Sequence, residues 1–265
     1  MTETVPTLNE LADALAHAEA SRIPIAPLSQ LHPGLTVDEA YEVQQINVAK
    51  KLAGGARIIG RKVGLTSKAM QEQLKVDQPD HGAITDDMLV SAPTTVDVSV
   101  LISSRVEGEF AFRTGSHIPA GRYTLAELRQ LIDQVYVSME IIDSRIADWK
   151  IGLVDTIADN ASSARLVVGQ GVAATAELFD SLPGTTLELI KDGELLAAGP
   201  GSAVLGDPLL GALWVVNRLG ELGEDIEAGE DYLAGAVHAS VPLTPGSTWT
   251  VQAQGFIPAT IETAK

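Results

Sequence analysis

The chain has 265 residues, of which 45% are hydrophobic and 20% are charged, a balance typical of a globular protein with a sizeable core. Its formal net charge of −17 excludes a surface built to attract nucleic acid or an anionic membrane. Cysteine is absent, which excludes disulfides, thiolate catalysis and cysteine-bound zinc. The acidic N-terminal segment lacks the basic start of a signal peptide, and no apolar run could span a membrane, so we expect a cytoplasmic protein.

Two capped helices are predicted near the N-terminus. Thr7 or Asn9 can cap the first helix, which carries leucines at helical spacing along one face. Thr36 and Glu39 form a capping box at the start of the second helix, which we expect to end at Gly54. No linker rich in proline, glycine and serine follows, so we expect this helical region to pack tightly against the rest of the chain.

Two segments after the helices place charged residues in unusual settings. Residues 57–65, RIIGRKVGL, predict a strand in which Lys62 either reaches solvent at a sheet edge or points into a pocket. Residues 76–82, VDQPDHG, are polar and bounded by proline and glycine. This composition predicts a surface loop that could cover a site.

Three glutamates stand in strand-like, mostly apolar segments. Glu107 and Glu109 are two residues apart, so a strand would direct both side chains to the same face. Glu140 lies in a second such segment, residues 135–142. If the three carboxylates meet in a cleft, they form an oxygen site suited to Mg²⁺ or Mn²⁺. The alternative is that Glu107 and Glu109 line the solvated face of an edge strand.

The rest of the chain mixes short strands with helices and shows no regular βαβ repeat. A capping box at Thr124 opens a helix, and Asp192-Gly193 marks a type I′ hairpin. From these patterns we expect an α+β fold, with a small helical lobe at residues 1–55 and a β-rich body at residues 56–265.

Three stretches resemble one known family: RVEGEFAF, SRIADWKIGLVDTIADNASS and GRKVGLTSKAMQEQLKVDQPDHG. They are similar to the 2-hydroxypenta-2,4-dienoate (2-keto-4-pentenoate) hydratases, which group with the 4-oxalocrotonate decarboxylases in the fumarylacetoacetate hydrolase superfamily. The resemblance extends from about Ala18 to about Gly255. It implies a curved, barrel-like sheet with flanking helices, and a homo-oligomer that acts alone or in complex with a decarboxylase or aldolase of the same pathway.

The resemblance also implies an active site. In it, Glu107, Glu109 and Glu140 hold one Mg²⁺ or Mn²⁺ ion, which the 2-oxo acid substrate chelates through its carboxylate and its 2-oxo group. Lys62 is the expected proton donor or substrate clamp, and Asp80 is the expected base for the incoming water.

Other polar residues are expected near this site with less specific roles. The resemblance places Asn160 and Ser162 against the substrate, although both residue types are also common in turns, which residues 155–163 predict. His81 departs from the aromatic residue that is frequent in the family, so we interpret it as a histidine on the loop surface. His238 stands where a small polar residue is usual, and it either reaches the pocket or is structural.

The implied reaction is hydration of a 2-hydroxy-2,4-dienoate (2-oxo-4-enoate) to a 4-hydroxy-2-oxo acid in the catabolism of aromatic compounds. Decarboxylation of 4-oxalocrotonate, a 2-oxo-3-hexenedioate, is the second candidate, because it needs the same metal and the same enolate. A third candidate is a catalytically inactive partner subunit, against which the presence of all three glutamates and of Lys62 argues.

Overall fold

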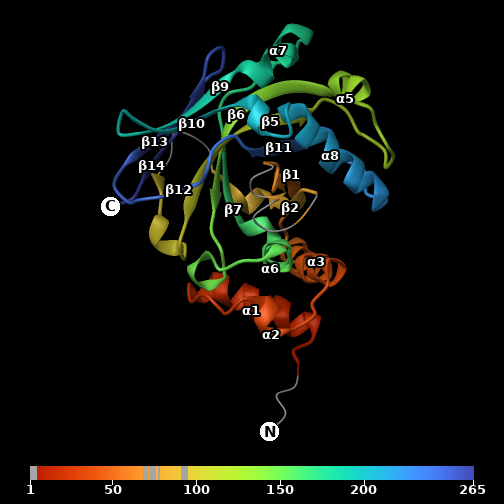
Figure 1. Ribbon diagram of the computed structural model, residues 1–265, viewed down its shortest axis with the longest axis vertical. Coiled ribbons are helices and arrows are strands. Elements are labelled where there is room, and N and C mark those ends of the chain that lie inside the picture. The colour runs from red at the N-terminus through yellow and green to blue at the C-terminus, as the bar shows by residue number, and fades with distance from the viewer. Residues whose placement is uncertain (1–4, 68–70, 72–75, 77, 91–94) are drawn as a thin grey trace.

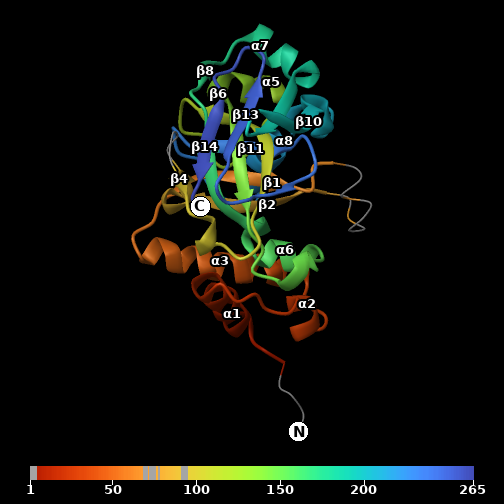
Figure 2. The ribbon, with the colours of Figure 1, turned by 90° about the vertical axis from the view of Figure 1, so that its left-hand side faces the viewer.

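The computed structural model describes residues 5–67, 71, 76, 78–90 and 95–265. The N-terminal helices lie at one end of the molecule, and the strands with their flanking helices form a larger body beside them (Figure 1). Figure 2 shows the same separation from the side. The α+β architecture expected from the sequence is confirmed.

The helices at the N-terminus are α1 (Leu8–Ser21), α2 (Leu28–Leu31) and α3 (Val37–Ala53). Thr7 caps α1, and Thr36 and Glu39 make the predicted capping box of α3. The hydroxyl of Thr36 accepts the backbone N–H of Glu39 at 3.3 Å, and the Glu39 carboxylate accepts the backbone N–H of Thr36 at 2.8 Å. Local sequence alone therefore determines where these helices begin.

The N-terminal helices share an apolar cluster with a later helix, α6 (Leu153–Ala158). Leu11 and Leu15 of α1 and Val43 of α3 pack in this cluster together with Ile157 of α6. The expected tight packing is therefore observed, while the domain boundary at residue 55 stays a prediction.

The larger sheet has the strand order β2–β1–β11–β5–β6–β7–β3, with β12 paired to β5 and β8 to β6. The pairs β1–β11 and β3–β7 are parallel and the other neighbours are antiparallel. The sheet curls into a half-barrel, as the family resemblance implied (Figure 1). Its strands are β1 (Ile58–Gly64), β2 (Asp80–Thr85), β3 (Leu89–Val90), β5 (Arg105–Thr114), β6 (Ile132–Ile142), β7 (Ser163–Val168), β8 (Val172–Ala173), β11 (Asp231–Ala236) and β12 (Val241–Pro242).

A second sheet has the order β10–β9–β13–β14–β4. Its strands are β4 (Thr95–Val96), β9 (Thr186–Lys191), β10 (Glu194–Pro200), β13 (Thr248–Ala253) and β14 (Ala259–Thr263). The predicted type I′ turn between β9 and β10 is confirmed by positive φ angles at Asp192 (51°) and Gly193 (87°). The main apolar core joins the two sheets and includes Phe110, Val137, Leu187, Trp249 and Val251.

The remaining helices flank the sheets. Besides α6, they are α5 (Leu125–Leu131), α7 (Ala176–Ser181) and α8 (Pro208–Glu221), with 3₁₀ turns η1 (Asp86–Met88), η2 (Val98–Val100), η3 (Ala147–Trp149), η4 (Asn160–Ser162), η5 (Leu182–Gly184) and η6 (Gly201–Ala203). Helix α8 packs so closely on β11 at Gly211 that a Cβ atom there would lie only 2.2 Å from the carbonyl oxygen of Ala234. In the described part of the chain, no helix is long and apolar enough to cross a membrane.

Two expectations from the sequence are wrong. Asp80, His81 and Gly82 do not belong to a surface loop: they begin strand β2, which is buried along its length and pairs with β1. Residue 77 of the expected loop lies outside the described residues. The segment 155–163, interpreted as a turn, begins within helix α6.

Candidate active site

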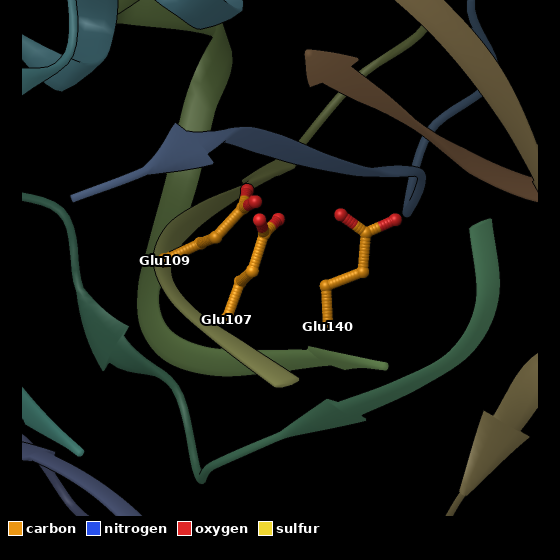
Figure 3. Close-up of side chains that lie close together, drawn as sticks. All are labelled: Glu107, Glu109 and Glu140. Atoms are coloured by element: carbon orange, nitrogen blue, oxygen red, sulfur yellow. The ribbon is translucent and has the colours of Figure 1, made fainter. Parts of the chain in front are cut away.

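Glu107, Glu109 and Glu140 converge inside the curl of the larger sheet (Figure 3). Glu107 of β5 is directly opposite Glu140 of β6 in the strand register, and Glu109 is two residues further along β5 on the same face. One carboxylate oxygen from each of the three residues lies within 4.8 Å of the others. The solvated-edge alternative for Glu107 and Glu109 is therefore wrong, because β5 lies between β11 and β6.

Two of these carboxylates, those of Glu109 and Glu140, lack hydrogen bonds that buried oxygen atoms normally make. Glu109 Oε2 accepts the backbone N–H of Gly235 at 2.9 Å, but Glu109 Oε1 and both oxygens of Glu140 have no hydrogen-bond partner among the described residues. Lys62 Nζ lies 3.3 Å from Glu140 Oε2 as an ion pair without hydrogen-bond geometry. Three convergent carboxylates, two of which have buried oxygens without hydrogen bonds, are a donor set that fits Mg²⁺ or Mn²⁺.

The protonation behaviour of the cluster agrees with a site for a cation. Burial raises the pKa of Glu107 to about 7, and Glu140 adds to the rise while Lys62 opposes it. Burial also raises the pKa of Glu109 well above its usual range, and again Glu140 adds to the rise. Crowded carboxylates repel each other in a low dielectric, and a divalent cation between them would reverse these shifts.

Lys62 projects from β1 into this cluster and is almost completely buried. Its Nζ donates a hydrogen bond to the carbonyl oxygen of Ala161 at 3.0 Å. Burial alone would lower the pKa of Lys62, but the carboxylates around it, chiefly Glu140 and then Asp80, raise it overall. Lys62 is therefore a charged group inside the site, and the alternative of an exposed lysine at a sheet edge is wrong.

Asp80 begins β2 and points into the same space. It pairs with Gly64 of β1, where a Cβ atom would lie 2.2 Å from Asp80 Oδ1, so glycine leaves room for the carboxylate. Asp80 Oδ1 is buried without a hydrogen-bond partner among the described residues. Burial raises the pKa of Asp80, Lys62 lowers it, and Glu140 raises it further. The structure thus brings Asp80 next to Lys62, as the resemblance implied.

His81 is not the surface histidine that we expected. It is buried and stacks on Tyr41 of α3, with ring centroids 4.8 Å apart and an interplanar angle of 21°. Successive strand residues point to opposite faces, so His81 points away from Asp80 and from the glutamates. Burial lowers the pKa of His81 to about 4, and Arg61 and Arg218 add to this effect. His81 is therefore a neutral packing residue.

The turn η4 carries Asn160 and Ser162 and has three consecutive positive φ angles, of 53°, 50° and 56°. This backbone turns the carbonyl of Ala161 toward Lys62. The amide of Asn160 exchanges two hydrogen bonds with the backbone of Ala83, each at 2.8 Å, and so fastens η4 to β2. Ser162 Oγ is buried without a partner in the described chain and lines the main cavity. The predicted substrate contact is favoured by this geometry for Ser162 and not for Asn160.

A cavity of about 630 Å³ opens above the cluster. Its lining includes Lys62, Asp80, Glu107 and Ser162, and also Arg105, Trp149, His238 and Ser240. His238 does reach this cavity, and its Nε2 accepts the backbone N–H of Gly108 at 3.2 Å. Arg105 was missed, although its position two residues before Glu107 in the same strand indicated the same face.

The chain is 40% identical over 246 residues to the 2-keto-4-pentenoate hydratase of Paraburkholderia xenovorans (strain LB400). The aligned region covers 93% of this chain and 91% of that protein. This chain belongs to the 2-keto-4-pentenoate hydratase family. A second family member, the 2-hydroxyhexa-2,4-dienoate hydratase of Comamonas testosteroni, is 36% identical over 234 residues, with 88% of each chain covered. No protein-family model matches the sequence.

Solved structures extend the family relationship to the fold. The 4-oxalocrotonate decarboxylase from Pseudomonas putida G7, complexed with magnesium and adipate, superimposes with a TM-score of 0.90 at 34% identity over 97% of both chains. Fumarylpyruvate hydrolase from Pseudomonas aeruginosa, in complex with Mn²⁺ and pyruvate, gives a TM-score of 0.60 at 13% identity, covering 77% of this chain and 88% of that one. This second similarity shows the shared fold alone. The expected family and its place among fumarylacetoacetate hydrolase-like folds are confirmed.

Proposed function

We propose that this protein hydrates a 2-hydroxy-2,4-dienoate, the enol form of a 2-oxo-4-enoate, to a 4-hydroxy-2-oxo acid in the catabolism of aromatic compounds. The observation that carries the proposal is the under-bonded cluster of Glu107, Glu109 and Glu140 beside a cavity whose lining includes Glu107, Lys62 and Asp80. The hydratases among its relatives support the reaction, and the metals named with the solved structures support Mg²⁺ or Mn²⁺ as the cofactor.

The three glutamates would hold the ion, because they offer three convergent oxygens and a local excess of negative charge. When bound, a divalent ion polarises the 2-oxo group of the substrate and stabilises negative charge on its oxygen. Buried surroundings strengthen this interaction, because bulk water would screen it.

The chain's own residues would handle the protons and the substrate carboxylate. Before water adds, the enol proton of the substrate leaves the 2-hydroxyl and a proton is added at C5, which gives the conjugated 2-oxo-3-enoate. Asp80 then accepts a proton from the water whose oxygen bonds to C4, and burial raises the pKa of Asp80 above the usual range of an aspartate. Lys62, kept charged by its neighbours, either donates the proton that C3 receives or binds the substrate carboxylate. Ser162 Oγ, which lacks a partner among the residues described, can donate a hydrogen bond to that carboxylate.

Turnover of a 2-hydroxy-2,4-dienoate with added Mg²⁺ tests the proposal. We expect the dienol absorbance to disappear without release of CO₂, and we expect EDTA to abolish the activity. Release of CO₂ from 4-oxalocrotonate would instead indicate the decarboxylase, the second candidate, which the similarity to the solved decarboxylase supports. If neither substrate is consumed, the proposal is contradicted, and the third candidate, an inactive partner subunit, remains.

Substitutions at Lys62 and Asp80 test their roles. Lys62→Met keeps the aliphatic stem, so we expect kcat/KM to fall at least about 100-fold while divalent-ion affinity is not reduced. Asp80→Asn should lower kcat about 100-fold or more but change the affinity for an unreactive 2-oxo acid less than about threefold, because its role is proton transfer. A Lys62→Met variant within twofold of wild type, or an Asp80→Asn variant that loses binding as strongly as turnover, would contradict these assignments.

Assembly and location complete the proposal. A small 2-oxo or 2-hydroxydienoate substrate fits the cavity, and we propose a homo-oligomer in the cytoplasm, alone or with a decarboxylase or aldolase of the same pathway. Light scattering of the purified protein, with and without such a partner, measures the assembly directly.

A further inference from the structure

Arg105 occupies the outer end of the row of charged side chains on strand β5. It precedes Glu107 by two residues and Glu109 by four, so alternation directs all three to the same face. At about 3.3 Å per residue, the Cα of Arg105 lies roughly 7 Å from that of Glu107 and roughly 13 Å from that of Glu109. Glu109 is buried, whereas Glu107 and Arg105 are only partly buried, so Arg105 stands at the more open end of the cavity.

The guanidinium of Arg105 is held in place by neutral groups. Its Nε donates to Ser240 Oγ and its Nη2 to the carbonyl oxygen of Ser240, both at 2.7 Å. The guanidinium carbon lies 5.9 Å from the ring centroid of Trp149, and both Ser240 and Trp149 line the cavity. Within the described residues, no carboxylate lies at ion-pair distance from Arg105, and its Nη1 makes no hydrogen bond.

An arginine without an ion-pair partner is unexpected in this molecule, although Arg105 lies close enough to Glu107 to lower the pKa of that carboxylate. The chain has 35 acidic and 18 basic residues, and the other cation in the cavity, Lys62, is paired with Glu140. A planar guanidinium fixed by two hydrogen bonds and an aromatic ring loses little freedom when it binds a carboxylate, and Nη1 with the second hydrogen of Nη2 remains available. The site therefore offers an oriented anion-binding group at the end opposite to the proposed metal.

We propose that Arg105 binds a second carboxylate at the far end of the substrate, so that the preferred substrates are 2-hydroxydienoates and 2-oxo acids that are dicarboxylates. This inference rests on the proposed function, because the glutamate cluster must hold the ion that takes the 2-oxo acid end. A cavity of about 630 Å³ has room for a chain longer than five carbons. A five-carbon substrate that ends in an apolar group would place no charge beside Arg105.

The proposal does not depend on which reaction the site catalyses. A distal carboxylate belongs to a dienedioate that is hydrated, and equally to a hexenedioate that is decarboxylated. The competing explanation is that Arg105 only supports β12, because it pairs with Pro242 and holds Ser240 just before that strand. A purely supporting role would affect ligands with and without a distal carboxylate equally.

The test compares two unreactive ligands with the same number of carbons and the same 2-oxo acid end. 2-Oxohexanoate ends in a methyl group, and 2-oxohexanedioate ends in a carboxylate; neither has the double bond that hydration requires. Isothermal titration in the presence of Mg²⁺ should show that the wild-type protein binds the dicarboxylate at least about tenfold more tightly. In Arg105→Met this preference should disappear, while the affinity for 2-oxohexanoate stays within about twofold of wild type.

Two further variants complete the design. Arg105→Lys keeps the charge but loses the fork geometry, so it should retain part of the preference. Arg165→Met removes one positive charge from β7 outside the lining of the cavity and should keep the full preference. Equal binding of the two acids by wild type, or an Arg105→Met variant that weakens both equally, would overturn the Arg105 subsite alone. If neither acid binds wild type with Mg²⁺, the proposed metal site is wrong as well.

Discussion

Two buried charged clusters in this protein differ in how their polar atoms are bonded. Arg145 and Asp159 form an ion pair in which Arg145 Nε donates to Asp159 Oδ1, while Asp159 Oδ2 accepts the backbone N–H of Arg145 at 3.0 Å. The remaining guanidinium nitrogens of Arg145 donate to the carbonyl oxygens of Ser163 and Asp159. In the glutamate cluster, by contrast, Glu109 Oε1 and both oxygens of Glu140 have no hydrogen-bond partner in the described chain.

The difference separates a structural role from a functional one. Burial is costly for any charge, and both clusters are buried, so burial alone identifies neither as a site. The Arg145–Asp159 pair offsets that cost with hydrogen bonds inside the protein. The glutamate cluster leaves several oxygens without partners, and the missing interactions are those that a divalent ion would supply. Unsatisfied acceptors therefore indicate a ligand more reliably than buried charge does.

Breaking the Arg145–Asp159 ion pair should produce the largest loss of stability. Asp159→Asn removes the ion-pair partner of the buried Arg145 charge, so we expect the free energy of unfolding to fall by about 3–5 kcal/mol. Urea unfolding at pH 7 measures this change. The control is Asp13→Asn, which removes an exposed ion pair with Lys50 and should cost less than about 1 kcal/mol. A folded Asp159→Asn variant should still bind Mg²⁺; a variant of wild-type stability would remove the contrast between the two clusters.

Removing a charge from the glutamate cluster should leave stability intact and weaken metal binding, the reverse of the effect expected for Asp159→Asn. In Glu109→Gln, the side-chain oxygen can still accept the Gly235 N–H, and one source of repulsion is lost. We expect unchanged or slightly higher stability without metal, and a loss of divalent-ion affinity of about 100-fold or more, since altering even an indirect supporting group can cost 10–100-fold. Calorimetric titration with Mn²⁺ measures the affinity. Loss of stability with intact metal binding would contradict the assignment.

His81 is a buried titratable group that is neutral, in contrast to the two charged clusters. Its folded-state pKa of about 4 lies below the ordinary value of about 6.5, so between these pH values the unfolded chain binds a proton that the folded chain does not. Stability from this residue is therefore present above about pH 6.5 and is lost as the pH falls toward 4. Between pH 7 and pH 5 the loss should be about 2 kcal/mol.

The carboxylates with raised pKa values titrate in the same range, so the measurement is a difference between proteins. His81→Phe can keep the stacking on Tyr41 and cannot be protonated. Urea unfolding gives the free energy of unfolding of wild type and variant at pH 7 and pH 5. The His81 contribution is the loss of stability between these pH values in wild type minus the loss in the variant. Equal losses of stability in wild type and variant would show that His81 is solvated or has a hydrogen-bond partner in solution.

Local signals allowed much of the fold to be predicted from the sequence. Thr7, Thr36 and Thr124 start helices through capping boxes that involve residues three positions away, and Asp192-Gly193 sets its hairpin in the same local way. The glutamate cluster could be anticipated because alternation places Glu107 and Glu109 on one face. The family resemblance then supplied the partners in distant parts of the chain.

The errors arose where distant residues decide the outcome. Asp80 was predicted to lie in a loop because residues 76–82 are polar and bounded by proline and glycine, but Lys62 on the adjacent strand offsets the burial of its carboxylate. The substrate contact of Asn160 stays a prediction, but nothing in the sequence indicated that its amide hydrogen-bonds the backbone of Ala83, 77 positions earlier in the chain. Neither pairing leaves a trace in the local sequence.

The register of β5 and β6 has a consequence for folding fidelity. Because Glu107 and Glu140 lie opposite each other, the two carboxylates meet only in the native pairing of these strands. A slip of one residue would turn one of them to the other face of the sheet. An ion that needs both carboxylates binds the correctly paired chain and not its misaligned forms, and binding to one form raises its population. The metal that serves the reaction would thereby also select the molecules able to carry it out.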